Sequence, residues 1–195
     1  MRILRSGQGG LWRQPPNGRA PLPRFSVLIQ SDRDAIAERI LVPGGPLVMG
    51  TNPLLASRIF ASVELSKFEK RGEIVRIFRA LRGGDRPKNS ESEFPDFSVI
   101  PRSQFEPWGL FRRRAAGTVA DNHRIYGAGG LRRVSDTLPF SDVIESAPAG
   151  RREKALAPHP SLKPQRFVRA IVRAAMPMGG IILYPFAGSG RRTRW

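Results

Sequence analysis

The residues best suited to chemistry lie near the end of the chain, in the run Tyr184-Pro185-Phe186-Ala187-Gly188-Ser189-Gly190. Gly188 and Gly190 can form a tight turn in which bare backbone approaches a ligand closely. Residues 181–183 (Ile-Ile-Leu) precede this turn, and such a short apolar, β-branched run predicts a buried strand. A strand that enters a glycine turn is typical of nucleotide-type sites in α/β proteins, although Gly-Ser-Gly also occurs in ordinary loops.

Two further polar side chains precede the turn, in the run His159-Pro160-Ser161-Leu162-Lys163-Pro164. After Pro164 a 3.6-residue period predicts an amphipathic helix that ends near Pro177. At the mouth of this helix, His159 and Lys163 could meet a ligand or a phosphate backbone. The alternative is that His159-Pro160 is an ordinary turn and Lys163 a solvated charge. The apolar face of the helix would carry Phe167, Val168, Ile171, Val172 and Ala175, with Arg166, Arg169 and Arg173 opposite.

The order of these segments extends upstream to the run Phe140-Ser141-Asp142-Val143-Ile144. An Asp-Val pair, His-Pro-x-x-Lys-Pro, a helix and Pro-Phe-x-Gly-Ser-Gly together resemble the carboxy-terminal half of DNA amino methyltransferases, the N-4 cytosine and N-6 adenine family with the cofactor motif last. The resemblance is specific from Phe140 to Gly190 and weaker from Leu47 to Phe111. It implies binding of S-adenosylmethionine and methyl transfer to the exocyclic amine of an adenine or cytosine flipped out of double-stranded DNA.

The resemblance also implies roles for individual residues. The glycine turn would pass against the methionine and ribose of the cofactor, and Phe186 would pack beside it unless it is an ordinary core residue. The cofactor-binding candidates are therefore Phe186, Gly188, Ser189, Gly190, His159 and Lys163.

The sequence departs from the family pattern at three places. Tyr184 stands where the family has an acidic residue before Pro-Phe. The single Pro-Pro pair, Pro15-Pro16, is flanked by Gln14 and Asn17, where the catalytic signature has Asp or Ser and an aromatic residue. This pair is either a degenerate catalytic motif or a coincidence. The sequence ends at Trp195, before the helix and acidic strand end that would hold the ribose, so we expect a truncated enzyme with weak or no activity.

A strong positive charge bears on the partner. The 195 residues carry a formal net charge of +17, and only five of the 33 basic residues are lysines. Such a charge favours nucleic acid as the partner. The alternative is that a bias in base composition has scattered arginines along the chain without a function. The alternative function is a non-enzymatic basic nucleic-acid-binding protein. A segment with little periodicity, residues 114–158, is either a target-recognition insertion or disordered. The DNA-binding candidates lie in and beside it: Arg112, Arg113, Arg124, Arg132 and Arg133.

Composition excludes several classes of site. Because the chain has no cysteine, disulfides and thiolate metal sites are absent, and its two histidines lack acidic neighbours at ligand spacing. We therefore expect no metal. The sequence has no apolar stretch of about 20 residues and no secretory signal, so we expect a cytoplasmic protein without a membrane partner.

These motifs require an α/β scaffold, which we expect to be a partial Rossmann-like methyltransferase sheet with an irregular basic insertion. The pattern predicts helices from Ser31 to about Pro43 and from Pro53 to Gly72, and strands at 47–50, 73–79 and 106–111. Trp108 and Phe111 are expected to pack in the core. The predicted organisation is an irregular segment (1–30), an α/β part (31–113), the insertion (114–158) and the cofactor-motif segment (159–195).

Overall fold

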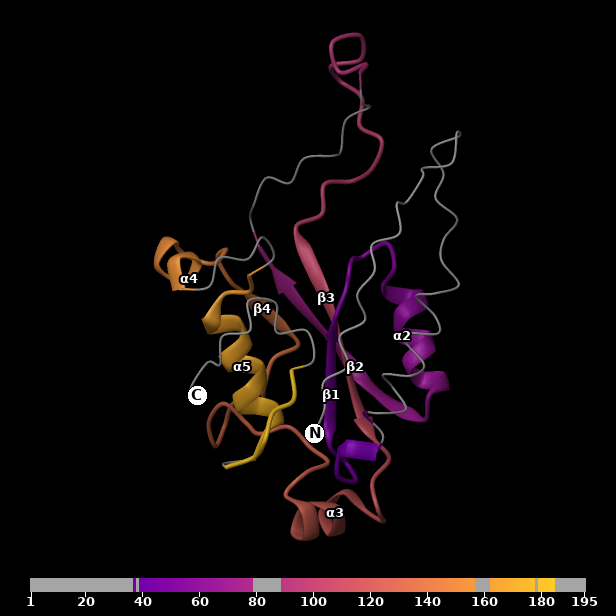
Figure 1. The fold of residues 1–195 in the computed structure, drawn as a ribbon, viewed down its shortest axis with the longest axis vertical. Coiled ribbons are helices and arrows are strands. Elements are labelled where there is room, and N and C mark those ends of the chain that lie inside the picture. The colour runs from indigo at the N-terminus through magenta and orange to yellow at the C-terminus, as the bar shows by residue number, and fades with distance from the viewer. Residues whose placement is uncertain (1–36, 38, 79–88, 157–161, 178, 185–195) are drawn as a thin grey trace, which may run out of the picture.

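The computed structural model describes residues 37, 39–78, 89–156, 162–177 and 179–184. Its centre is a four-stranded sheet in the order β1-β3-β2-β4 (Figure 1). Because β3 is antiparallel to β1 and β2, and β4 is parallel to β2, three strands share one direction and β3 alone opposes them. The predicted α/β class is confirmed, and the mixed sheet is consistent with a partial Rossmann-like fold. The strands are β1 (Pro46–Gly50), β2 (Phe68–Ile77), β3 (Phe105–Arg113) and β4 (Val143–Glu145).

Helix α2 (Ala56–Leu65) covers one face of the sheet. Its Phe60 and Val63 pack on Phe111, and the rings of Phe60 and Phe111 meet edge to face with centroids 5.7 Å apart. Gly109 makes this approach possible, since a Cβ there would lie 2.8 Å from the ring of Phe60. The expectation that Phe111 is a core residue is confirmed.

The predicted limits of this helix were wrong at both ends. The helix begins at Ala56, three residues after Pro53, and ends at Leu65. Lys67 then adopts a positive φ of 69°, which reverses the chain directly into β2. Gly72, expected to end the helix, instead lies inside β2 at a shift in the pairing register, where its φ of 146° suits a bulge.

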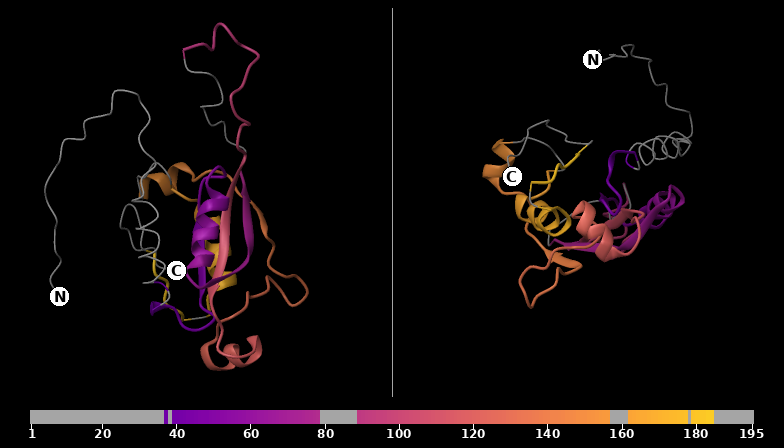
Figure 2. Two further views of the ribbon diagram at one scale, coloured as in Figure 1. Left: turned by 90° about the vertical axis from the view of Figure 1, so that its right-hand side faces the viewer. Right: turned by 90° about the horizontal axis from the view of Figure 1, so that it is seen from below.

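Helix α5 (Gln165–Ala175) covers the opposite face, as the two views of Figure 2 show. The predicted period is confirmed, because Phe167 and Ile171 are buried against Ile74 of β2 and Trp108 of β3. The rings of Trp108 and Phe167 lie 5.0 Å apart, which confirms that Trp108 packs in the core. The sheet is thus enclosed between one helix on each face.

The segment predicted to be an insertion, residues 114–158, is more regular than expected. It contains α3 (Val119–Tyr126), the edge strand β4 and α4 (Arg151–Leu156). Thr118 caps α3 by accepting a hydrogen bond from the backbone N–H of Asp121, and Gly127 ends the helix in the left-handed conformation. The spacing Thr-x-x-Asp is a start signal that the sequence prediction overlooked.

The predicted terminal strand is wrong for the part that the structure describes. Residues 181–184 form no strand, and Ile181 and Leu183 are 93% and 59% exposed. β-propensity alone does not make a strand, because the backbone needs a neighbouring strand to bond with, and none pairs with this segment among the described residues. The glycine turn lies outside the described residues. Within the described part, no helix is long and apolar enough to cross a membrane.

Candidate functional site

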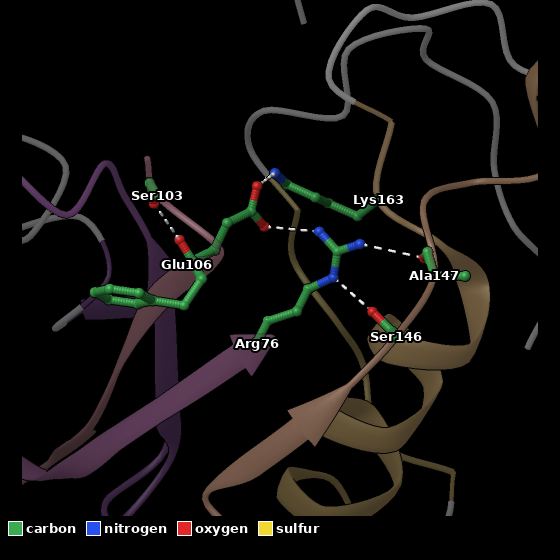
Figure 3. A network of polar contacts seen from close by, with 7 residues as sticks. Arg76, Ser103, Glu106, Ser146, Ala147 and Lys163 are labelled. Carbon is green, nitrogen blue, oxygen red and sulfur yellow. Dashed lines mark hydrogen bonds and ion pairs between the residues drawn. The ribbon is translucent and has the colours of Figure 1, made fainter. Parts of the chain in front are cut away.

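The site lies at the sheet edge where β1, β2 and β4 all end. In α/β sheets, ligands bind outside the carboxyl ends of parallel strands. Arg76 near the end of β2 faces Glu106 near the start of β3 in the strand register. Gly50 ends β1 and pairs with Trp108, which lies two residues after Glu106 in β3. The segment that precedes α5 reaches the same edge through Lys163 (Figure 3).

The carboxylate of Glu106 joins the two cations. Its Oε2 accepts a hydrogen bond from Arg76 Nη1 at 2.9 Å, and its Oε1 accepts one from Lys163 Nζ at 2.7 Å. Arg76 also donates from Nε to Ser146 Oγ at 2.6 Å and from Nη2 to the carbonyl of Ala147 at 3.3 Å. This charged trio of Arg76, Glu106 and Lys163 therefore fastens the segments after β4 and before α5 to the centre of the sheet.

Burial gives the charged trio its electrostatic character. Arg76 and Glu106 are only 4% and 6% exposed, so neither charge is well solvated. Burial alone raises the pKa of Glu106, but the hydrogen bonds from Lys163 and Arg76 and their positive charges outweigh it, and the net pKa lies below its ordinary value. Glu106 is therefore ionised near neutral pH and is unsuited to donate a proton. With one carboxylate and two cations, the trio carries a net positive charge.

Aromatic side chains border the charged trio. Lys163 Nζ lies 6.0 Å from the ring centre of Trp108, and the guanidinium of Arg76 lies 5.4 Å from that of Phe167. A Cβ on Gly50 would come within 2.7 Å of the Trp108 indole, so the glycine lets the ring lie flat on the end of β1. Trp108 Nε1 is buried and has no hydrogen-bond partner among the described residues. This edge can attract an anionic group and hold it beside an aromatic surface.

Of the predicted cofactor-binding residues, the structure places one. Lys163 lies in the charged trio, so it is an ion-paired side chain rather than a free solvated one. His159, Phe186, Gly188, Ser189 and Gly190 lie outside the described residues, as do Pro15 and Pro16. Among the residues that the structure does describe, no group of three or more side chains could hold a metal ion.

The predicted DNA-binding arginines lie elsewhere and differ among themselves. Arg112 and Arg113 occupy the opposite end of β3, where both have internal partners. Arg112 pairs with Glu69 at 2.6 Å and donates to the carbonyl of Gly129, and Arg113 donates to the carbonyl of Leu41. The other three candidates, Arg124, Arg132 and Arg133, are exposed. Arg124 lies on α3 and pairs with Asp121.

A pocket of about 250 Å³ opens beside Arg112 at that opposite end. Gly44 and Gly129 line it, and the buried Asn122 holds the two loops together by donating to the carbonyls of Pro43 and Ala128. Arg71 and Arg112 both line this pocket, and the guanidinium of Arg112 is paired with the carboxylate of Glu69.

Sequence reasoning missed Arg76 and Glu106 as functional residues. The available signal was the position of Arg76 between Ile74 and Phe78 on one face of a strand, where an apolar residue is expected. An arginine at a buried position requires an acidic partner, but its identity could come only from the pairing of β2 with β3. The sequence could therefore have indicated the buried cation without locating its carboxylate.

No family model matches the chain, and no curated protein matches it. Among solved structures, the chain is similar to one described as the crystal structure of the M1.HpyAVI–SAM complex, with a TM-score of 0.45 and 13% sequence identity. The match covers 80% of this chain and 62% of that chain, so it spans less than two thirds of the other protein.

Proposed function

We propose that this chain binds S-adenosylmethionine and double-stranded DNA as a DNA amino methyltransferase of the N-4/N-6 type, whose reaction is methyl transfer to the exocyclic amine of adenine or cytosine. The observation that carries the proposal is the convergence of two parts of the sequence motif. The Asp142-Val143 pair enters β4, and Lys163 precedes α5, twenty residues later. Ser146, which follows β4, bonds to Arg76, and Lys163 bonds to Glu106, so the segments after β4 and before α5 reach the same carboxyl edge of the sheet.

The chemistry of this edge fits the cofactor. S-adenosylmethionine carries a carboxylate, which can accept a hydrogen bond from Lys163, and an adenine, which suits the surface beside Trp108. Lys163 uses one of its three N–H donors on Glu106, and its side chain is 27% exposed, so further donors can face a ligand. When bound, the cofactor supplies an activated methyl group. The role of this chain at the edge is to bind and orient.

The residues that would act on the target base are weaker matches. Pro15 and Pro16 remain candidates for a degenerate catalytic motif, but Gln14 and Asn17 supply neither the acid that would hold the amine nor the aromatic ring that would stack on a flipped base. We therefore expect cofactor binding with weak or absent methyl transfer.

Isothermal titration calorimetry of the purified chain with S-adenosylmethionine tests the proposal. We expect saturable binding, which Lys163→Gln weakens by roughly tenfold or more because a charge-assisted hydrogen bond contributes about 1.5–3 kcal/mol. Lys154→Gln, at an exposed lysine on α4, is the matched control and should bind like the unmodified chain. Absence of saturable binding by the folded protein would contradict the proposal.

The second candidate function is a non-enzymatic nucleic-acid-binding protein, which the net charge of +17 favours. DNA binding that weakens steeply with salt, together with no heat of S-adenosylmethionine binding, would favour this alternative.

A further inference from the structure

A row of arginines follows the solvent side of α5. Arg166, Arg169 and Arg173 are all exposed, whereas the apolar side of the same helix is buried against the sheet. At 3.6 residues per turn these three positions fall within about 60° of one another around the helix axis. With a rise of 1.5 Å per residue, they span about 10 Å along it.

A loop from the insertion lengthens the row at the end of α5. The backbone N–H of Arg132 donates to the carbonyl of Ala174 at 2.7 Å, which satisfies a terminal carbonyl of the helix and fixes the loop there. Arg132 and its neighbour Arg133 are exposed. The five residues that we call the α5 arginine strip are Arg132, Arg133, Arg166, Arg169 and Arg173.

The strip is not neutralised by nearby acids. Helix α5 contains no acidic residue, and in the part of the chain that the structure describes none of the five guanidinium groups forms an ion pair with a carboxylate. In contrast, Arg112 and Arg124 each have a carboxylate partner, and Arg113 bonds to a backbone carbonyl. The five arginines of the strip therefore lie together on and beside α5 without a carboxylate partner among the described residues.

We propose that the α5 arginine strip grips the phosphate backbone of double-stranded DNA. Successive phosphates of one strand advance by about 3.4 Å along the duplex axis, so the 10 Å from the first to the last arginine of the helix matches about three phosphates. Guanidinium groups bind phosphate oxygens through paired N–H donors. Because the buried side of α5 fixes the helix to the sheet, the strip is presented in one orientation.

The same geometry argues against a membrane as the partner. A helix that lies on a bilayer inserts its apolar face between the lipids. The apolar face of α5 is already used, because Phe167, Ile171 and Ala174 are buried in the protein. The proposal rests on the proposed function for the identity of the partner, and it adds the surface by which that partner is held.

Fluorescence anisotropy with a labelled duplex of about 20 base pairs, measured over a range of salt, tests the proposal. We compare Arg166→Gln/Arg169→Gln/Arg173→Gln with a control of equal charge at three exposed arginines away from α5: Arg39→Gln/Arg58→Gln/Arg71→Gln. Loss of three phosphate contacts should make the slope of log Kobs against log salt shallower by about 3 and weaken binding at low salt by roughly tenfold or more, with a smaller change in the control. The variant Arg166→Lys/Arg169→Lys/Arg173→Lys keeps the three charges and should keep most of the salt dependence of binding.

Each other outcome has a defined meaning. Equal slopes for the strip variant and its control, when circular dichroism shows that both chains are folded, would contradict DNA binding by the α5 arginine strip. This result would leave the proposal of S-adenosylmethionine binding unaffected. Binding of the unmodified chain to phosphatidylserine vesicles but not to duplex DNA would overturn the strip and the DNA partner together. Because calorimetry with the cofactor is independent of the strip, the two proposals fail separately.

Discussion

Replacing Glu106 by glutamine removes the carboxylate of the charged trio and keeps the size of the side chain. The change leaves Arg76 charged in a place where its side chain is only 5% exposed, although its bonds to Ser146 and Ala147 remain. The second cation, Lys163, has a side chain that is 27% exposed and can turn toward water. The loss is therefore dominated by one buried guanidinium without its counter-charge.

Removing one partner of a buried ion pair costs about 3–5 kcal/mol. Because the guanidinium of Arg76 keeps two hydrogen bonds, we expect the lower end, about 3 kcal/mol, which corresponds to a fall in Tm of roughly 6–12 °C for a domain of this size. Urea unfolding followed by circular dichroism measures the change. Glu73→Gln is the matched control, since its partner Lys70 forms an exposed pair that contributes less than about 1 kcal/mol.

The pH dependence of the difference follows from the lowered pKa of Glu106. The carboxylate stabilises the folded chain above the ordinary carboxyl value of 4.5, and the contribution is lost as the pH falls through the lower pKa of the folded state. The stability gap between the unmodified chain and Glu106→Gln should thus be full near pH 7 and shrink below about pH 4.5. A Glu106→Gln chain no less stable than Glu73→Gln at pH 7 would refute the role assigned to the trio.

Other substitutions test the packing around the site by the same unfolding assay. Gly109→Ala should cost about 1–3 kcal/mol because its methyl group meets the ring of Phe60, whereas Gly130→Ala has open space and should be neutral; equal effects would contradict the close approach of α2. Asn122→Ala should cost about 1–3 kcal/mol, since it removes the bonds from a buried amide to the carbonyls of Pro43 and Ala128, and a neutral result would show that water replaces the amide. Thr118→Ala should cost about 1 kcal/mol through loss of the cap on α3, with no change if that helix is held only by its packing.

The elements with a strong period could be read from the sequence. Helix α5 appears as predicted because five apolar positions repeat at helical spacing, and the strand predicted at 73–79 overlaps the second half of β2. Gly72 misled the prediction because a glycine marks a helix end and a strand bulge equally well, and only the pairing with β3 distinguishes them. The run at 181–184 misled it because propensity says nothing about whether a partner strand is present.

The candidate site was harder to predict because its contacts join distant parts of the sequence. Lys163 was recognised from its motif, but its partner Glu106 lies 57 residues earlier, and the link from Arg76 to Ser146 spans 70 residues. Sequence spacing carries no information on such pairs without the strand register. The roles of the predicted glycine turn and of Pro15 and Pro16 stay predictions.

The two core clusters of the sheet also set an order for its assembly. Every residue of the cluster under α2 lies between Ala37 and Phe111, whereas the cluster under α5 needs side chains from Val48 to Ile171. Because chains fold from the amino terminus as they are synthesised, the α2 side can form while the last helix has not yet been made. Ile74 and Trp108 stay uncovered on the other face while about 60 further residues are synthesised. At 5–20 residues per second this takes on the order of several seconds. During that interval the nascent sheet presents an open apolar face, the kind of surface that chaperones shield.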